Sequence, residues 1–245
     1  MKVCIISGAS SGIGKAIAHE LDTFGFDELW LIGRNECRLK ETKGNLKSNA
    51  RIFTIDLCST DAYSVLENEL SNGKYEVGAL VLSAGVGYTG TLEENTHSKI
   101  TNMIDTNCKS LTLLINTVMH YIPRGGKIIT LASGAGFLPQ ADFAVYAATK
   151  SYVISLSRAL CKELKQKGIT VCTVCPGPVD TDFFAGLENV KEHKRKYLIS
   201  PQRVAKGAVK AAWKGKSLYV PTVSMKLLHI ASKLLPTSLL IKFAK

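Results

Sequence analysis

The chain has 245 residues, of which 46% are hydrophobic and 21% are charged, and this composition excludes collagen-like, low-complexity and disordered proteins. The net charge of +11 arises in the second part, because residues 1–150 carry 14 Lys and Arg against 15 Asp and Glu, whereas residues 151–245 carry 17 against 5. That asymmetry indicates either an anionic partner (a phosphate-bearing cofactor, an acidic carrier protein, a lipid surface or a nucleic acid) or a solvated basic face.

Short apolar runs alternate along the chain with longer stretches of helical period. The runs predict strands at residues 3–6, 28–32, 51–55, 79–82, 127–131, 169–174 and 218–220, and the stretches predict helices at 13–24, 62–70, 100–121, 146–166 and 201–213. Because parallel strands need crossover connections and bury both faces, the pattern predicts an α/β fold: a doubly wound, seven-stranded parallel sheet of Rossmann type with helices on both faces. We expect one catalytic domain over residues 1–223 and an amphipathic C-terminal extension over 224–245.

The first predicted strand leads through a glycine-rich turn directly into a helix. Glycines at such a turn let the backbone approach a pyrophosphate, whose charge is met by the helix N-terminus. The turn reads Ser7-Gly8-Ala9-Ser10-Ser11-Gly12-Ile13-Gly14. It predicts a dinucleotide site, to which we assign Gly8, Ser10, Ser11, Gly12, Ile13 and Gly14.

The ends of the second and third predicted strands bear on the choice of cofactor. Arg34 follows the second strand, where an acidic residue would accept from a free ribose 2′-hydroxyl and an arginine would pair with a 2′-phosphate. Since Arg38 lies one turn later, we expect NADP(H) over NAD(H), the alternative being that Arg34 stacks on the adenine. Asp56 and Leu57 follow the third strand, where a carboxylate either accepts from the adenine amino group or caps a helix.

The densest set of reactive side chains lies between Asn107 and Lys150. Tyr146 and Lys150 are four apart on a predicted helix and therefore share a face. An ammonium near a phenol favours the phenolate, so we expect the Tyr146 pKa to fall from about 10 toward the range of an acid–base catalyst. Tyr–Lys pairs at this spacing are common by chance, but the glycine-rich turn and Ser133 at the end of the fifth strand favour the catalytic interpretation.

These residues resemble the motifs of the short-chain dehydrogenases/reductases over residues 2–223. The turn is similar to the family's T-G-x-x-x-G-x-G, and Tyr146 to Lys150 are similar to its Y-x-x-x-K. Ser133 stands at the family's catalytic serine, Asn107 at its helix asparagine, and residues 176–181 at its P-G-x-x-x-T segment. Two positions depart from the family: its threonine is Ser7, and its N-N-A-G is Leu82-Ser83-Ala84-Gly85, which leaves open how the end of the fourth strand is tied to its neighbours.

The resemblance implies an oxidoreductase that transfers hydride between C4 of NADP(H) and a carbonyl or secondary alcohol. Tyr146 would donate or accept the proton, and Ser133 would hold the substrate oxygen. Lys150 would bind the nicotinamide ribose, and Asn107 would hold a water that connects Lys150 to solvent. The resemblance also implies a homodimer or homotetramer, and cofactor contacts from Ser83, Ala84, Gly85, Pro176, Gly177, Val179 and Thr181.

The segment over residues 179–200 is expected to form a substrate lid, the alternative being a solvated loop. Its apolar part is Phe183, Phe184 and Leu187, and its basic part is Lys191, His193, Lys194, Arg195 and Lys196. Phe137, Leu138 and Phe143 are expected to add apolar surface near Tyr146. We therefore expect a small hydrophobic carbonyl substrate, free or carrier-bound, such as a 3-oxoacyl compound, a steroid or a lipid ketone.

The C-terminal extension has an apolar face and a polar face. The apolar face comprises Met225, Leu227, Leu228, Ile230, Ala231, Leu234 and Leu235, opposite Lys226, His229, Ser232 and Lys233. Three interpretations remain: packing on the body or a second subunit, lining the substrate pocket, or lying in an anionic membrane interface.

The seven cysteines are odd in number and scattered, which indicates a reducing compartment. Cys172 and Cys175 form a C-x-x-C within a predicted strand, where residues three apart point to opposite faces, so we expect no metal site. The first apolar run is too short for a signal-peptide core, and we expect a cytoplasmic protein, with peripheral membrane contact through the extension as an option. A non-catalytic NADP-binding scaffold is the alternative function, whereas nucleic-acid binding is disfavoured because the basic residues lack interleaved aromatics.

Overall fold

The computed structural model describes residues 1–187 and 197–241. Its centre is a seven-stranded sheet of order β3-β2-β1-β4-β5-β6-β7, in which every neighbouring pair is parallel. The strands are β1 (Lys2–Ser7), β2 (Glu28–Gly33), β3 (Ala50–Thr54), β4 (Glu76–Leu82), β5 (Lys127–Leu131), β6 (Thr170–Val174) and β7 (Leu218–Tyr219). The predicted doubly wound sheet is confirmed.

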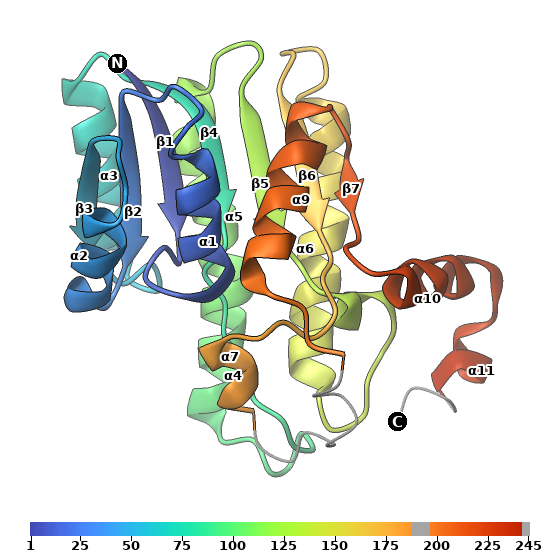
Figure 1. Ribbon diagram of the computed structural model, residues 1–245. Helices are drawn as coiled ribbons and strands as arrows, with labels where there is room; N and C mark the ends of the chain where they lie inside the picture. Colours follow the sequence, from blue (N-terminus) through green and yellow to red (C-terminus); the bar gives the residue numbers. More distant parts are fainter. Residues whose placement is uncertain (188–196, 242–245) are drawn as a thin grey trace.

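Helices cover both faces of the sheet (Figure 1). One face carries α1 (Gly12–Leu21), α2 (Glu36–Gly44) and α9 (Pro201–Trp213), and the other carries α3 (Asp61–Asn72), α5 (Ser110–Val118) and α6 (Ala144–Glu163). The remaining helices are α4 (His97–Ile104), α7 (Asp182–Ala185), α10 (Val223–Leu234) and α11 (Thr237–Ile241). No helix in the described part of the chain is long and apolar enough to cross a membrane.

Alternate residues of each central strand enter two separate cores. On β1, Val3 and Ile5 pack under α3, α5 and α6, whereas Cys4 and Ile6 pack under α1 and α9. Burial on both faces explains why the strands are almost uninterrupted apolar runs. The same alternation places Cys172 and Cys175 in different cores, and all seven cysteines are free.

The helix predicted over residues 100–121 is interrupted. A π-helical turn at Asp105–Lys109 separates α4 from α5, and the segment ends in a 3₁₀ turn at Met119–Tyr121. Helix α2 is not among the predicted helices, because only Leu39 and Thr42 of its nine residues are buried and no apolar period arises.

The strand order predicts a ligand site at the carboxyl ends of the strands. The chain moves outward from β1 to β3 on one side and from β4 to β7 on the other, so the connections that leave β1 and β4 diverge. In open α/β sheets, ligands bind in the crevice at this switch point, outside the carboxyl ends of the strands.

Candidate active site

A cavity of about 1590 Å³ opens at the carboxyl ends of the strands. This volume exceeds the 300–1,000 Å³ or so that a single small ligand needs, so a dinucleotide and a substrate fit together. The residues of the sequence prediction that line it are Gly8, Ser10, Ser11, Gly12, Ile13, Arg34, Asp56, Leu57, Ser83, Ala84, Gly85, Ser133, Tyr146, Lys150, Pro176, Gly177, Val179 and Thr181. Gly14 and Asn107, which the sequence also predicts as site residues, do not line the cavity.

The glycine-rich turn presents backbone N–H groups to the cavity. Gly8 and Gly12 adopt positive φ angles of 68° and 53°. A Cβ on Gly14 would lie 2.2 Å from the carbonyl oxygen of Gly8, so α1 starts directly against the turn. The N-cap residue of α1, Ser11, makes no side-chain capping hydrogen bond. The first N–H groups of α1 therefore lack a side-chain acceptor, and they fit the phosphates of a dinucleotide.

Ser7 ties the end of β4 to the end of β1. Its Oγ accepts hydrogen bonds from the backbone N–H groups of Ser83 at 3.2 Å and Ala84 at 3.3 Å. The serine hydroxyl thus secures the strand end where the family's amides are absent. Ser7 is not among the predicted site residues, although the hydroxyl that it shares with the family's threonine indicates such a role.

Replacement of Ser7 with Ala should destabilise the fold by about 1 kcal/mol or more, because a hydroxyl that is 2% exposed no longer pairs two backbone N–H groups. For a chain of this size the melting temperature should fall by about 2–4 °C per kcal/mol. Thermal unfolding followed by circular dichroism measures the change. Ser7→Thr, which keeps the hydroxyl, is the matched control, and equal melting of the Ala and Thr variants would contradict the assignment.

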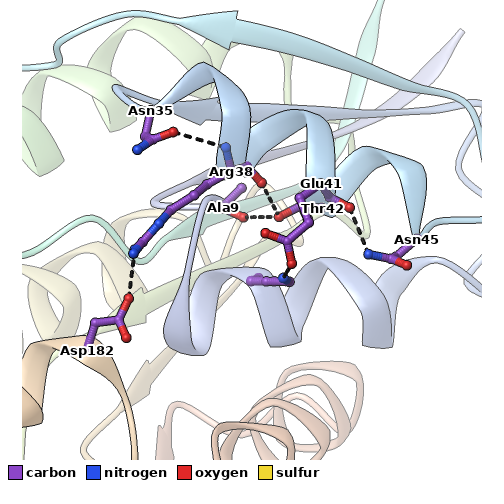
Figure 2. A network of polar contacts seen from close by, with 8 residues as sticks. Ala9, Asn35, Arg38, Glu41, Thr42, Asn45 and Asp182 are labelled. Atoms are coloured by element: carbon purple, nitrogen blue, oxygen red, sulfur yellow. Dashed lines mark hydrogen bonds and ion pairs between the residues drawn. The ribbon is translucent and has the colours of Figure 1, made fainter.

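Two arginines that follow β2 differ in their partners. Arg38 Nη1 forms an ion pair with Asp182 Oδ2 at 2.7 Å, which joins α2 to the first turn of α7, as Figure 2 shows. Arg34 lines the cavity, is exposed, and forms no ion pair within the described residues. Arg34 is therefore the arginine available to a 2′-phosphate, whereas the charge of Arg38 is already matched.

Asp56 stabilises the turn after β3. Its Oδ1 accepts from the backbone N–H of Cys58 at 3.0 Å, whereas the N-cap position of α3 belongs to Thr60. Asp56 is exposed at the cavity edge and forms a local turn rather than a helix cap.

The predicted catalytic side chains meet at the end of β5. Tyr146 and Lys150 project from α6 and are only 6% and 5% exposed. Lys150 Nζ donates to the carbonyl oxygen of Leu131 at 3.0 Å and lies 5.6 Å from the centre of the Tyr146 ring. Ser133 Oγ accepts from the N–H of Ala135 at 3.1 Å, which orients the hydroxyl at the end of β5.

The pKa values of this pair differ from the expectation. Burial raises the pKa of Tyr146 to about 12, and a hydrogen bond with Ser133 acts in the opposite direction. Burial also lowers the pKa of Lys150 to about 8. The expected lowering of the Tyr146 pKa by Lys150 is therefore wrong for the chain without cofactor, because loss of solvation dominates both groups. The phenol keeps its proton at neutral pH, as a proton donor requires.

Asn107 lies in the π-helical turn and is 1% exposed. Its Nδ2 donates to the Val86 carbonyl at 2.8 Å and to Thr149 Oγ1 at 2.9 Å, and its Oδ1 accepts from the Val86 N–H at 2.9 Å. Both N–H donors are used by the protein. The side chain thus fastens the loop after β4 to α6, beside Lys150. The expected role of Asn107 in holding a water stays a prediction. A π-helical turn at a functional site is a common arrangement.

Aromatic side chains enclose the Tyr146 ring. Phe143 stacks on it with ring centres 4.3 Å apart, and Phe183 of α7 lies at 5.5 Å. Phe184 and Leu187 also line the cavity, whereas Phe137 and Leu138 do not, because Phe137 packs on His229 and Leu138 is buried in the body. The apolar surface expected from residues 137 and 138 is thus absent from the cavity wall.

The described ends of the lid segment are held together. Val179 and Ile199 form a parallel bridge, and the N–H of Asp180 donates to the Ile199 carbonyl at 3.0 Å. The basic residues expected in this lid lie outside the described residues: Lys191, His193, Lys194, Arg195 and Lys196. From the C-terminal extension, Met225 and Leu228 line the cavity, which supports the pocket-lining interpretation for one face of that helix.

Curated relatives match most of this chain. A family model described as short chain dehydrogenase matches residues 2–192. An uncharacterized oxidoreductase of Staphylococcus epidermidis is 30% identical over 227 residues, which are 92% of this chain and 96% of that protein. A 3-oxoacyl-(acyl-carrier-protein) reductase of Salmonella typhimurium is 33% identical over 193 residues, covering 77% of this chain and 78% of that protein.

Solved structures share the fold. A short-chain dehydrogenase from Sphingobium yanoikuyae in complex with NADPH has a TM-score of 0.80 at 24% identity, covering 95% of this chain and 94% of that chain. A short-chain dehydrogenase/reductase from Burkholderia phymatum in complex with NAD has a TM-score of 0.81 at 21% identity, with coverage of 95% and 94%. At these identities the likeness concerns the fold alone, and the two structures hold different cofactors.

Proposed function

The chain belongs to the short-chain dehydrogenase family of oxidoreductases, and from that premise we propose that it is an NADP(H)-dependent reductase of hydrophobic carbonyl compounds, 3-oxoacyl thioesters first among them. The observation that carries the proposal is the meeting of half-buried Ser133 with buried Tyr146 and Lys150 in the cavity that begins at the glycine-rich turn. A cofactor seated on that turn and a substrate beside Tyr146 would occupy one continuous space.

When bound, the nicotinamide supplies or accepts the hydride. Tyr146 Oη donates its proton to the substrate oxygen during reduction and takes it back during oxidation. Ser133, whose Oγ is oriented by the N–H of Ala135, donates a hydrogen bond to the same oxygen. Lys150 uses one N–H on Leu131 and has two left for the ribose hydroxyls of the cofactor. Asn107 holds the loop after β4 against α6 and thereby positions Lys150.

The walls of the substrate end favour an apolar chain. Phe143, Phe183, Phe184, Met225 and Leu228 line the cavity around or beyond Tyr146. The Salmonella relative is named as a reductase of 3-oxoacyl groups on an acyl carrier protein. The positive charge of residues 151–245 would suit an acidic carrier, so carrier-bound 3-oxoacyl chains are our leading substrate class, with steroids and lipid ketones next.

A substrate panel with NADPH tests the proposal, with absorbance at the nicotinamide band as the readout. The panel holds 3-oxoacyl thioesters of increasing chain length, a steroid ketone and a polar sugar ketone. We expect NADPH consumption with the thioesters and a KM that falls as the chain lengthens, because each buried methylene contributes about 0.8 kcal/mol. A preference for the sugar ketone would contradict the apolar assignment, and inactivity with every ketone would favour the non-catalytic scaffold.

Replacement of Arg34 with Ala should weaken NADPH binding by about tenfold to a hundredfold and leave NADH binding nearly unchanged, because a charge-assisted pair with the 2′-phosphate contributes about 1.5–3 kcal/mol. Fluorescence titration with both cofactors measures the effect. Arg38→Ala is the matched control and should change NADPH affinity much less, since Arg38 is paired with Asp182. Tighter binding of NADH than NADPH by the unmodified protein would refute the role of Arg34.

Three broader features belong to the same proposal. Residues 1–223 form the catalytic domain, with 224–245 as its extension. The protein works as a homodimer or homotetramer, as the family resemblance implies. It resides in the cytoplasm, where its seven free cysteines would stay reduced.

A further inference from the structure

Helix α10 has two apolar faces with different surroundings. Met225 and Leu228 line the cavity, and the adjacent His229 packs against Phe137 in a tilted arrangement with ring centres 4.7 Å apart. The other apolar residues of the helix point to solvent: Val223, Leu227, Ile230 and Leu234 are 70%, 62%, 53% and 77% exposed. Because these four recur at helical spacing, they form one continuous stripe, here called the α10 stripe.

Exposed apolar residues concentrate in this part of the molecule. Thirteen large hydrophobic residues are exposed among those the structure describes, and six of them lie within residues 223–239: the α10 stripe with Leu235 and Leu239. Figure 1 shows α10 and α11 projecting beside β7, away from the helices that cover the sheet. Contiguous exposed apolar surface of this kind marks an interaction site.

The extension that carries the stripe holds charge of a single sign in its sequence. Residues 224–245 include four Lys and no Asp or Glu, and two of these lysines, Lys226 and Lys233, are exposed on α10 itself. A symmetric pairing of two copies through the stripe would bring these lysines together with no carboxylate in the extension to neutralise them. The combination of an exposed apolar stripe and positive charge instead matches an anionic lipid surface.

We propose that the α10 stripe, flanked by Lys226 and Lys233, docks this protein peripherally on membranes that contain anionic lipids. The helix lies in the plane of the interface, with the stripe among the acyl chains and the lysines near the lipid phosphates. The opposite face keeps its contacts with the body, so docking requires no unfolding of the extension. The inference goes beyond the proposed reductase activity and does not depend on it.

Vesicle flotation of the full-length chain tests the proposal. We expect binding to vesicles of phosphatidylcholine mixed with phosphatidylglycerol, weak binding to phosphatidylcholine alone, and release from the mixed vesicles as salt is raised. Leu227→Asp and Ile230→Asp should each weaken partitioning about tenfold or more, because a buried apolar side chain is replaced by a charge. Lys226→Ala should weaken it about fivefold.

The matched control is Val65→Asp, since Val65 is 48% exposed on α3, outside the extension. This variant should bind the mixed vesicles as the unmodified chain does. Circular dichroism shows whether each variant is folded. Equal flotation of Leu227→Asp and the unmodified chain would overturn the proposal. Two other results would also overturn the proposal, each together with failure of the unmodified chain to bind vesicles. One is a concentration-dependent dimer that Leu227→Asp abolishes, and the other is binding to an acidic carrier protein that Leu227→Asp abolishes.

Discussion

Replacement of Tyr146 with Phe should lower turnover by at least 10²–10⁴-fold and leave NADPH binding near that of the unmodified protein. Proton transfer by a positioned acid contributes a factor of this size. The phenol holds its proton at neutral pH, since its pKa, which burial raises to about 12, lies far above 7. Phe removes that proton while it keeps the ring between Phe143 and Phe183. The loss should therefore appear in kcat rather than in cofactor affinity.

Steady-state kinetics and fluorescence titration with NADPH measure the two quantities separately. Tyr152→Phe is the matched control, since Tyr152 lies on the same helix but is 42% exposed and contacts Thr112 through its hydroxyl. It should keep nearly full turnover. A Tyr146→Phe protein with undiminished turnover would reject Tyr146 as the proton donor.

Replacement of Lys150 with Met should abolish most activity and yet stabilise the chain without cofactor. The unfolded chain binds the lysine proton with a pKa of 10.5, whereas burial lowers the folded value to about 8. Below pH 8 the buried ammonium therefore costs the folded state about 3 kcal/mol. Loss of the hydrogen bond to Leu131 offsets about 1 kcal/mol of this, so Met should raise the free energy of unfolding by about 2 kcal/mol at pH 7.

The pH dependence gives this effect its signature. Between pH 8 and 10.5 the unfolded chain binds a proton that the folded chain has released, so the stability of the unmodified protein gains from this group as pH rises. The advantage of Lys150→Met should therefore be full at pH 7 and shrink toward pH 10. Urea unfolding of both proteins at these two pH values measures the difference between their free energies of unfolding. Because the two proteins share all other titrating groups, the contributions of those groups cancel in this difference. A Lys150→Met protein less stable than the original at pH 7 would contradict the cost of the buried charge.

The sheet could be predicted because both faces of every central strand are buried. Val3, Cys4, Ile5 and Ile6 leave no polar position in β1, and such runs followed by helical period have few other solutions. The glycine-rich turn could also be predicted from the sequence, because the fold requires glycine there. A Cβ at Gly14 would clash with the Gly8 carbonyl oxygen.

The features that escaped prediction depend on contacts between distant residues. Arg38 and Asp182 are 144 positions apart in the sequence, and no local sequence pattern predicts that they pair. The pKa of Tyr146 was expected to fall because the sequence shows its neighbour Lys150 but not the burial of both groups. Helix α2 escaped because its few buried residues give no period, although Asn35 caps it by accepting from the N–H of Arg38.

The π-helical turn between α4 and α5 affects how this segment tolerates changes in length. Each residue of an α-helix advances the chain by about 100° around the axis, so one inserted residue would turn everything after it toward a new direction. The π-helical turn at Asp105–Lys109 accommodates one extra residue within a single wider turn. Leu111 and Leu114 therefore still face the core. A one-residue deletion there would restore regular winding and would rotate either Asn107 or the apolar side of α5 away from its partners.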